Sequence, residues 1–231
     1  MIEWQSYGSE MSFDLLQGVD PDFYLPPEEV AKRAQRIVSS AKTAVAAFCK
    51  SQNSKSVTRT ELATHAILLA KLDSIARSHQ LDPHFEEADI EDVQDLLEML
   101  AVVPFNQLID NGPLLLNPGF GETSQIVGGA DADLISGDLL VDIKVTKKGE
   151  MKVTDLDQLL GYFLLGRHQR SIDDKFPNIK RVAIYFARHG YLWELDAAVW
   201  TGHPQFLEIE EWFFKRASEP QSNLRTRHAR S

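Results

Sequence analysis

The most informative part of this chain is Gly128-Gly129-Ala130-Asp131-Ala132-Asp133-Leu134-Ile135-Ser136-Gly137-Asp138-Leu139-Leu140-Val141-Asp142-Ile143-Lys144-Val145. Gly137-Asp138 suits a two-residue hairpin turn, and the apolar residues on both sides favour strands. Such a turn pairs Ser136 with Leu139, which fixes the register outward from it. Because strand side chains alternate between faces, we expect Asp133 to face Asp142 and Asp131 to face Lys144, all on one side.

Two carboxylates in this arrangement need a partner. Directly opposed strand residues have Cβ atoms only ~4.5–5.5 Å apart, so Asp133 and Asp142 should repel each other. A divalent cation such as Mg²⁺ would offset that repulsion, since it takes carboxylate oxygens and keeps several waters. Lys144 would then orient the attacking water and neutralise charge on a phosphate. The hairpin therefore predicts a metal-dependent site acting on phosphate esters.

A helix is expected after the hairpin, capped by Thr154 and running to about His168. Its apolar positions are Leu156, Leu159, Leu160, Phe163 and Leu164. Gln158 and Tyr162 are four residues apart and should share one helix face.

In this order the parts resemble the PD-(D/E)XK nuclease superfamily, whose pattern is an Asp after the first core strand and Asp/Glu-x-Lys on the next. Gln158-Leu159-Leu160-Gly161-Tyr162 resembles the Q-x-x-x-Y motif of its RecB-like and Cas4-like branch. The resemblance covers roughly residues 120–195. It implies an α/β fold with a restriction-endonuclease-like core, a mixed β-sheet flanked by helices. It also implies metal-dependent hydrolysis of nucleic acid, with DNA favoured and RNA left open.

The resemblance also implies roles for particular residues. Asp133 and Asp142 would hold Mg²⁺ or Mn²⁺ with the Ile143 carbonyl as a further ligand, and Asp131 competes with Asp133 for the first position. Gln158 and Tyr162 would contact DNA or the active site. Many superfamily members add an upstream acidic residue, for which the sequence offers Glu61, Glu91, Glu98 and Glu122 without separating them.

Charge is unevenly distributed along the chain, which has 24 Lys and Arg against 34 Asp and Glu. Residues 82–110 contain nine acidic and no basic residues, whereas residues 144–188 contain ten basic and five acidic ones. A phosphate-binding face should therefore lie in the second region. The expected nucleic-acid contacts are Lys147, Lys148, Lys152 and Arg188, although a basic loop and a hairpin turn explain them equally well.

The rest of the chain sets the domain plan. Apolar periodicity predicts helices near 27–48, 58–76 and 89–100, and β-type patterns cover 124–135, 139–145, 181–187 and 191–195. A closing helix is expected over 206–215. We expect a helical region over 1–104 packed on the core, a nuclease-like core over 105–217 and a disordered basic tail over 218–231.

Composition narrows the setting and leaves an alternative. Cys49 is the only cysteine, so no intramolecular disulfide can form, and a reducing cytoplasmic location is expected. No apolar run reaches the ~20 residues needed to cross a bilayer. The competing function is a catalytically inactive nuclease-fold module that binds nucleic acid or a protein partner. A protein partner or a homodimer is compatible with either function.

Overall fold

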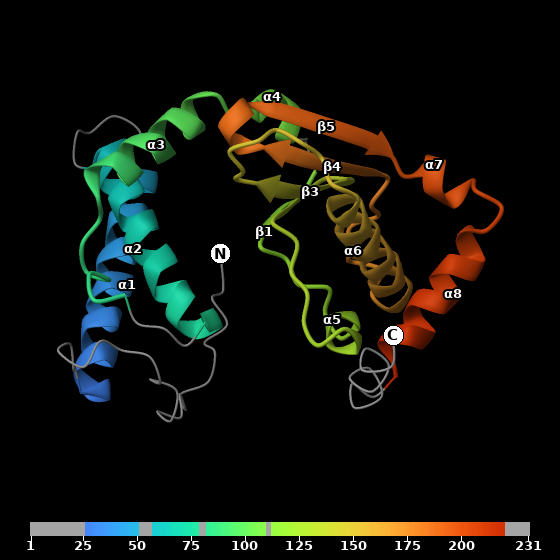
Figure 1. Cartoon of the computed structure of the whole chain (residues 1–231), viewed down its shortest axis with the longest axis horizontal. Helices are drawn as coiled ribbons and strands as arrows, with labels where there is room; N and C mark the ends of the chain where they lie inside the picture. Colours follow the sequence, from blue (N-terminus) through green and yellow to red (C-terminus); the bar gives the residue numbers. More distant parts are fainter. Residues whose placement is uncertain (1–25, 51–56, 79–81, 110–111, 220–231) are drawn as a thin grey trace. The chain divides into compact units, whose positions relative to one another are not determined.

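The computed structural model describes residues 26–50, 57–78, 82–109 and 112–219 (Figure 1). The first 25 residues of the expected helical region and most of the expected tail lie outside these residues. The chain divides after Ala101 into two compact units, close to the boundary expected at residue 104. Among the described residues, no helix has both the length and the apolar character that a membrane span requires.

The first unit is helical, as the periodicity predicted. Its helices are α1 (Pro27–Lys50), α2 (Arg59–Ser78) and α3 (Ile90–Ala101). Val30 and Ile37 of α1 are buried with Phe85 against leucines of α2. Thr58 and Glu61 form a capping box at the start of α2, because Glu61 N donates to Thr58 Oγ1 at 3.1 Å and Thr58 N donates to Glu61 Oε2 at 2.6 Å. Asp89 caps α3 by accepting from Glu91 N at 2.8 Å.

The second unit is a mixed α/β structure around one five-stranded sheet. Its strands are β1 (Leu114–Leu116), β2 (Leu134–Ser136), β3 (Leu139–Lys144), β4 (Arg181–Phe186) and β5 (Tyr191–Asp196), in that spatial order. Only β3 and β4 run parallel, and the other neighbours are antiparallel. Parallel neighbours need a long crossover, which here is helix α6 (Val153–Ile172). The α/β class with a helix-flanked mixed sheet is thus confirmed.

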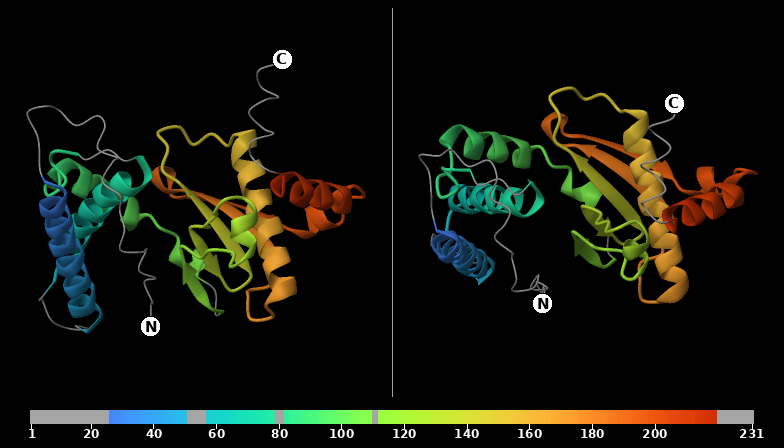
Figure 2. Two further views of the ribbon diagram at one scale, coloured as in Figure 1. Left: turned by 90° about the horizontal axis from the view of Figure 1, so that it is seen from below. Right: turned by 60° about the horizontal axis from the view of Figure 1, so that its bottom comes forward.

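Helix α6 runs along one face of the sheet (Figure 2). The core beneath it contains Ile135, Leu140 and Val182 from the strands and Leu159 and Phe163 from the helix, all buried. Helices α7 (Ala198–Thr201) and α8 (Phe206–Ala217) follow β5, and Phe206 adds to the same core. The remaining short elements are α4 (Phe105–Leu108), α5 (Thr123–Ile126) and the 3₁₀ turn η1 (Ala187–His189).

Two local predictions are wrong, and one short strand was not predicted. The strand expected over residues 124–135 is only β2, because Ser124 Oγ bonds Phe120 N and Ala130 O locally and forms a turn around α5. Gly128 and Gly129 then take positive φ values of 80° and 108°, which a strand cannot continue through. Strand β1 was not predicted, since its three leucines have no periodicity of their own. Helix α6 begins one residue before Thr154 and ends at Ile172, and its first turn is capped through Asp155, whose Oδ2 accepts from Lys152 N at 2.9 Å.

Candidate active site

The candidate site lies where β3 ends. Leu140, Asp142 and Lys144 alternate onto the face of the sheet that carries α6. Leu140 is fully buried in the core, and Asp142 is still only 3% exposed. On the neighbouring β4 these two polar positions pair with Ile184 and Phe186. Along β3, the side chains on this face therefore change from an apolar residue in the core to a buried carboxylate and then to a partly exposed ammonium.

Asp142 and Lys144 form an ion pair, with Lys144 Nζ 2.8 Å from Asp142 Oδ2. Oδ2 is buried, and apart from this ion pair it has no hydrogen-bond donor among the described residues. Burial raises the pKa of the Asp142 carboxyl; Lys144 opposes that rise, and the charges of Asp133 and Asp155 add to it. Asp142 is thus a buried carboxylate whose hydrogen bonding is incomplete.

Asp133 lies just before β2 and reaches across to β3. Its Oδ2 accepts a hydrogen bond from Ile143 N at 2.6 Å. The expected hairpin register is confirmed from Ser136↔Leu139 to Leu134↔Val141, after which the ladder ends. Asp133 nevertheless remains close enough to Asp142 for its negative charge to raise the pKa of that carboxyl.

The expected pairing of Asp131 with Lys144 is wrong. Asp131 forms an antiparallel bridge with Gly119 on the other side of the β2 strand, and Ala132 N donates to Pro118 O at 3.0 Å. The chain has left β3 by this point, because residues 131–133 pair with the segment that leads out of β1. Of the two contenders for the first acidic position, only Asp133 contacts β3 within the described structure.

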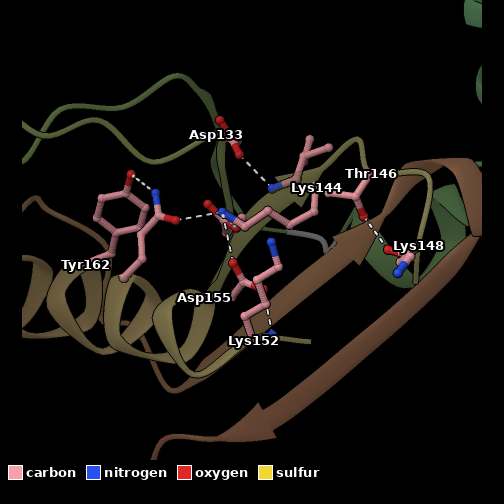
Figure 3. A network of polar contacts seen from close by, with 10 residues as sticks. Asp133, Lys144, Thr146, Lys148, Lys152, Asp155 and Tyr162 are labelled. Carbon is pink, nitrogen blue, oxygen red and sulfur yellow. Dashed lines mark hydrogen bonds and ion pairs between the residues drawn. The ribbon is translucent and has the colours of Figure 1, made fainter. Parts of the chain in front are cut away.

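Gln158 connects Lys144 to Tyr162 (Figure 3). Lys144 Nζ donates to Gln158 Oε1 at 2.6 Å, and Gln158 Nε2 donates to the Tyr162 hydroxyl at 2.8 Å. An ammonium can only donate, so the amide oxygen must face Lys144 and the NH₂ must face Tyr162. Tyr162 is therefore the acceptor, and its own O–H proton stays available for another group.

Tyr162 is half-buried beside this network. Its ring stacks on Phe120, with centroids 5.7 Å apart. Burial is the main cause that raises the pKa of the Tyr162 phenol, and the negative charges of Asp142 and Asp133 raise it further. The hydroxyl therefore remains protonated at neutral pH and can serve as a hydrogen-bond donor.

Asp155 also belongs to the site and was not anticipated from the sequence. One carboxylate oxygen caps α6, and the other lies 3.9 Å from Lys144 Nζ. Asp155, Gln158 and Tyr162 lie at offsets of three and seven residues, hence on one helix face. This spacing could have identified Asp155 from the sequence, but the helix was expected to be capped by Thr154.

The basic residues expected to contact nucleic acid separate into two groups. Lys147, Lys148 and Lys152 line one pocket of about 260 Å³ beside the site, together with Lys144, Asp155 and Phe186. Arg188 lies in η1 and is not among the residues that line this pocket. The loop between β3 and α6 therefore gathers three of the four expected contacts next to Lys144.

The upstream acidic candidates have different places. Glu61 is occupied by the capping box of α2, and Glu91 and Glu98 lie on α3 of the helical unit. Glu122 is exposed at the start of α5. Within the described ranges no three His, Cys, Asp or Glu side chains gather as a metal-binding group. The carboxylates whose charge acts on Asp142 are those of Asp133 and Asp155, and Ile143, whose carbonyl the resemblance offers as a further ligand, follows Asp142 on β3.

Comparison of the chain with protein-family models, curated proteins and solved structures finds no significant match. The chemistry of the site is therefore inferred from its residues and their geometry.

Proposed function

We propose that this chain is a metal-dependent nuclease with a restriction-endonuclease-like core, and that it hydrolyses phosphodiester bonds in DNA. One observation carries the proposal. The buried Asp142 carboxylate, with an oxygen that lacks a directed donor, lies beside Asp133 and Lys144 and opposite a helix that presents Gln158 and Tyr162. A carboxylate pair, an ammonium and two neutral polar groups at one strand end suit phosphate chemistry.

The donor set fits a hard divalent cation. Asp133 and Asp142 would hold Mg²⁺ or Mn²⁺, with the Ile143 carbonyl as a further ligand, because such cations take oxygen ligands. Asp142 Oδ2 is buried, and its close partner among the described residues is the Lys144 ammonium, so a bound cation would share this oxygen with Lys144. A bound cation would acidify a water molecule and stabilise negative charge on the phosphate.

The side chains around that cation have separable tasks. Lys144 holds its ammonium between Asp142 and Gln158, where it can orient a water and neutralise a phosphate oxygen. Gln158 gives this ammonium an anchor that does not depend on Asp142. Tyr162, whose proton is free within the described structure, can donate it to a non-bridging phosphate oxygen.

The test is cleavage of linear, circular and single-stranded DNA, and of RNA, in Mg²⁺ or Mn²⁺. Asp142→Asn and Lys144→Met should each lower the rate by at least about 100-fold, the lower end of what a positioned acid–base group contributes. Asp174→Asn and Lys175→Met are controls that make the same substitutions, because both residues are exposed and lie in the turn after α6, outside the sheet. Unchanged cleavage by either site variant refutes the proposed nuclease site.

A second candidate function is the inactive module that binds nucleic acid or a protein partner. It is favoured by the Lys144 ammonium, which already compensates Asp142, and by the absence of a three-residue metal group within the described residues. A thermal-shift titration separates the two functions, since a cation that binds the folded state must stabilise it. A saturable rise in melting temperature that Asp142→Asn abolishes supports the nuclease. No response at millimolar metal supports the module.

A further inference from the structure

The pocket beside the candidate site is walled by a braced loop. This loop, residues 145–152, joins β3 to α6. Thr146 Oγ1 donates to Lys148 O at 2.6 Å (Figure 3), and a Cβ added at Gly149 would lie 3.1 Å from His189 Cδ2, so the loop packs closely on that ring. At its end Lys152 N is fixed by Asp155. The lysines therefore project from a backbone that is held at several points.

The loop also carries uncompensated positive charge. Lys147, Lys148 and Lys152 are exposed, and none of their ammonium groups forms an ion pair with a residue that the structure describes. Glu150, the one acidic residue of the loop, lines the pocket with Asp155, so the lining carries four lysines against two carboxylates. A lysine ammonium is a compact point charge that suits phosphate oxygens. The pocket thus attracts an anion although the whole chain is acidic.

Size and shape favour a single phosphate group. The pocket of about 260 Å³ is smaller than the ~300–1,000 Å³ of sites that enclose whole small molecules. Buried Phe186, which pairs with Lys144 across the sheet, closes it on the side of β4. A group that enters from solvent therefore meets an apolar wall. Such a wall suits the end of a nucleic-acid strand better than a nucleic-acid strand that continues through the pocket.

The charge of the pocket also favours a terminal phosphate over an internal one. A terminal phosphomonoester carries about −1.5 to −2 at neutral pH, whereas an internal phosphodiester carries one negative charge. A pocket lined by four lysines and two carboxylates has a net positive charge, which a doubly charged group compensates more fully than a singly charged one. Lys144 and Asp155 belong both to this pocket and to the candidate active site, so the bound end would lie next to the reacting bond.

We propose that this pocket binds the terminal phosphate of a nucleic-acid strand, so that the enzyme cleaves close to a phosphorylated end. The inference rests on the proposed nuclease function, which supplies the strand and the cleavage. The pocket itself does not need the metal, because Lys147, Lys148 and Lys152 form no ion pair with the carboxylates that would hold it.

Binding is measured with the full chain in EDTA, so that cleavage cannot occur. The probes are fluorescent single-stranded DNAs of one sequence with a 5′-phosphate, a 3′-phosphate or two hydroxyl ends, and inorganic phosphate serves as the competitor. One phosphorylated end should bind at least about tenfold more tightly than the hydroxyl control. The triple variant Lys147→Ala, Lys148→Ala, Lys152→Ala should lose that preference. Lys175→Ala, an exposed lysine beyond the opposite end of α6, should keep it.

The outcomes separate this inference from the proposed function. Equal affinity for all three DNAs, no binding at all, or a preference that survives the triple substitution overturns the terminal-phosphate pocket, even where the wild-type protein cleaves DNA in Mg²⁺. A phosphate preference without any cleavage in Mg²⁺ or Mn²⁺ supports the pocket and contradicts the nuclease. Where the protein both prefers a phosphorylated end and cleaves DNA, the release of short products from that end supports the pocket and the nuclease together.

Discussion

Lys144 Nζ lies 2.6 Å from Gln158 Oε1, which connects the end of β3 to α6 across fourteen positions of chain. The same ammonium lies 2.8 Å from Asp142 Oδ2. The Lys144 ammonium therefore joins the buried Asp142 carboxylate to the polar face of the crossover helix α6. The stability and the chemistry of the site both depend on this shared contact.

Replacement of Lys144 by Met should destabilise the metal-free protein by about 2 kcal/mol, because it leaves Asp142 buried without its counter-ion. This is below the ~3–5 kcal/mol seen for fully buried pairs, since Lys144 keeps some contact with solvent. Asp142→Asn with Lys144→Met should lose less than Lys144→Met alone. Urea unfolding of the four proteins in EDTA gives the coupling energy, and additive effects would contradict a real ion pair.

Gln158→Glu and Tyr162→Phe should reduce cleavage to a similar extent, by about tenfold or more. A glutamate at 158 keeps the contact with Lys144 but can only accept, so it would take the Tyr162 proton that Gln158 leaves free. Single-turnover kinetics on one DNA substrate measures both. A Gln158→Glu enzyme as active as the wild type, beside an impaired Tyr162→Phe enzyme, would show that the direction of this hydrogen bond is irrelevant.

Stability should depend on pH through Asp142. Burial raises the pKa of this carboxyl in the folded state above its unfolded value near ~4, so the folded protein binds the proton more tightly. The associated stability is complete below the unfolded pKa and is lost as pH rises through the raised folded pKa. Asp142→Asn has no such loss. Its melting temperature relative to the wild type should therefore be higher at pH 7 than at pH 4 in EDTA, and a constant difference would rule out the raised pKa.

Two glycines of α6 should respond to alanine in opposite ways. A Cβ at Gly161 would have its nearest neighbour, Phe213, at 3.8 Å, so Gly161→Ala should stabilise the protein by up to ~1 kcal/mol through helix propensity. A Cβ at Gly166 would lie 2.5 Å from the buried Ile179 Cδ1. Gly166→Ala should therefore destabilise by ~1–3 kcal/mol through overpacking. Chemical denaturation compares them, and a shared sign would show that the packing around α6 is misassigned.

The parts of the fold that depend on local pattern were predictable. The hairpin register follows from the Gly137-Asp138 turn, and β3, β4, β5, α1, α2, α3 and α8 all fall where periodicity indicated. The Gln158–Tyr162 contact follows from a spacing of four residues on a helix. The confinement of Lys147, Lys148 and Lys152 to one pocket also agrees with the expected basic face.

The parts that depend on distant partners were not predictable. Asp131 pairs with Gly119 because β1 adds to the edge of β2, and three leucines give no warning of such a strand. Asp155 approaches Lys144 only because the crossover helix begins beside the end of β3. Ser124 turns the chain through two local hydrogen bonds that compete with an apparent strand pattern.

The amino-acid order alone determined which side chains share a face, namely Asp142 with Lys144 on a strand and Gln158 with Tyr162 on a helix, because backbone periodicity is a local property. Tertiary packing decided which atoms of these two pairs meet, that Asp142 would be buried, that Asp155 would approach Lys144, and that three lysines would line one pocket with Lys144. Those features arise from the way α6 crosses the sheet between β3 and β4, which no short window of residues contains.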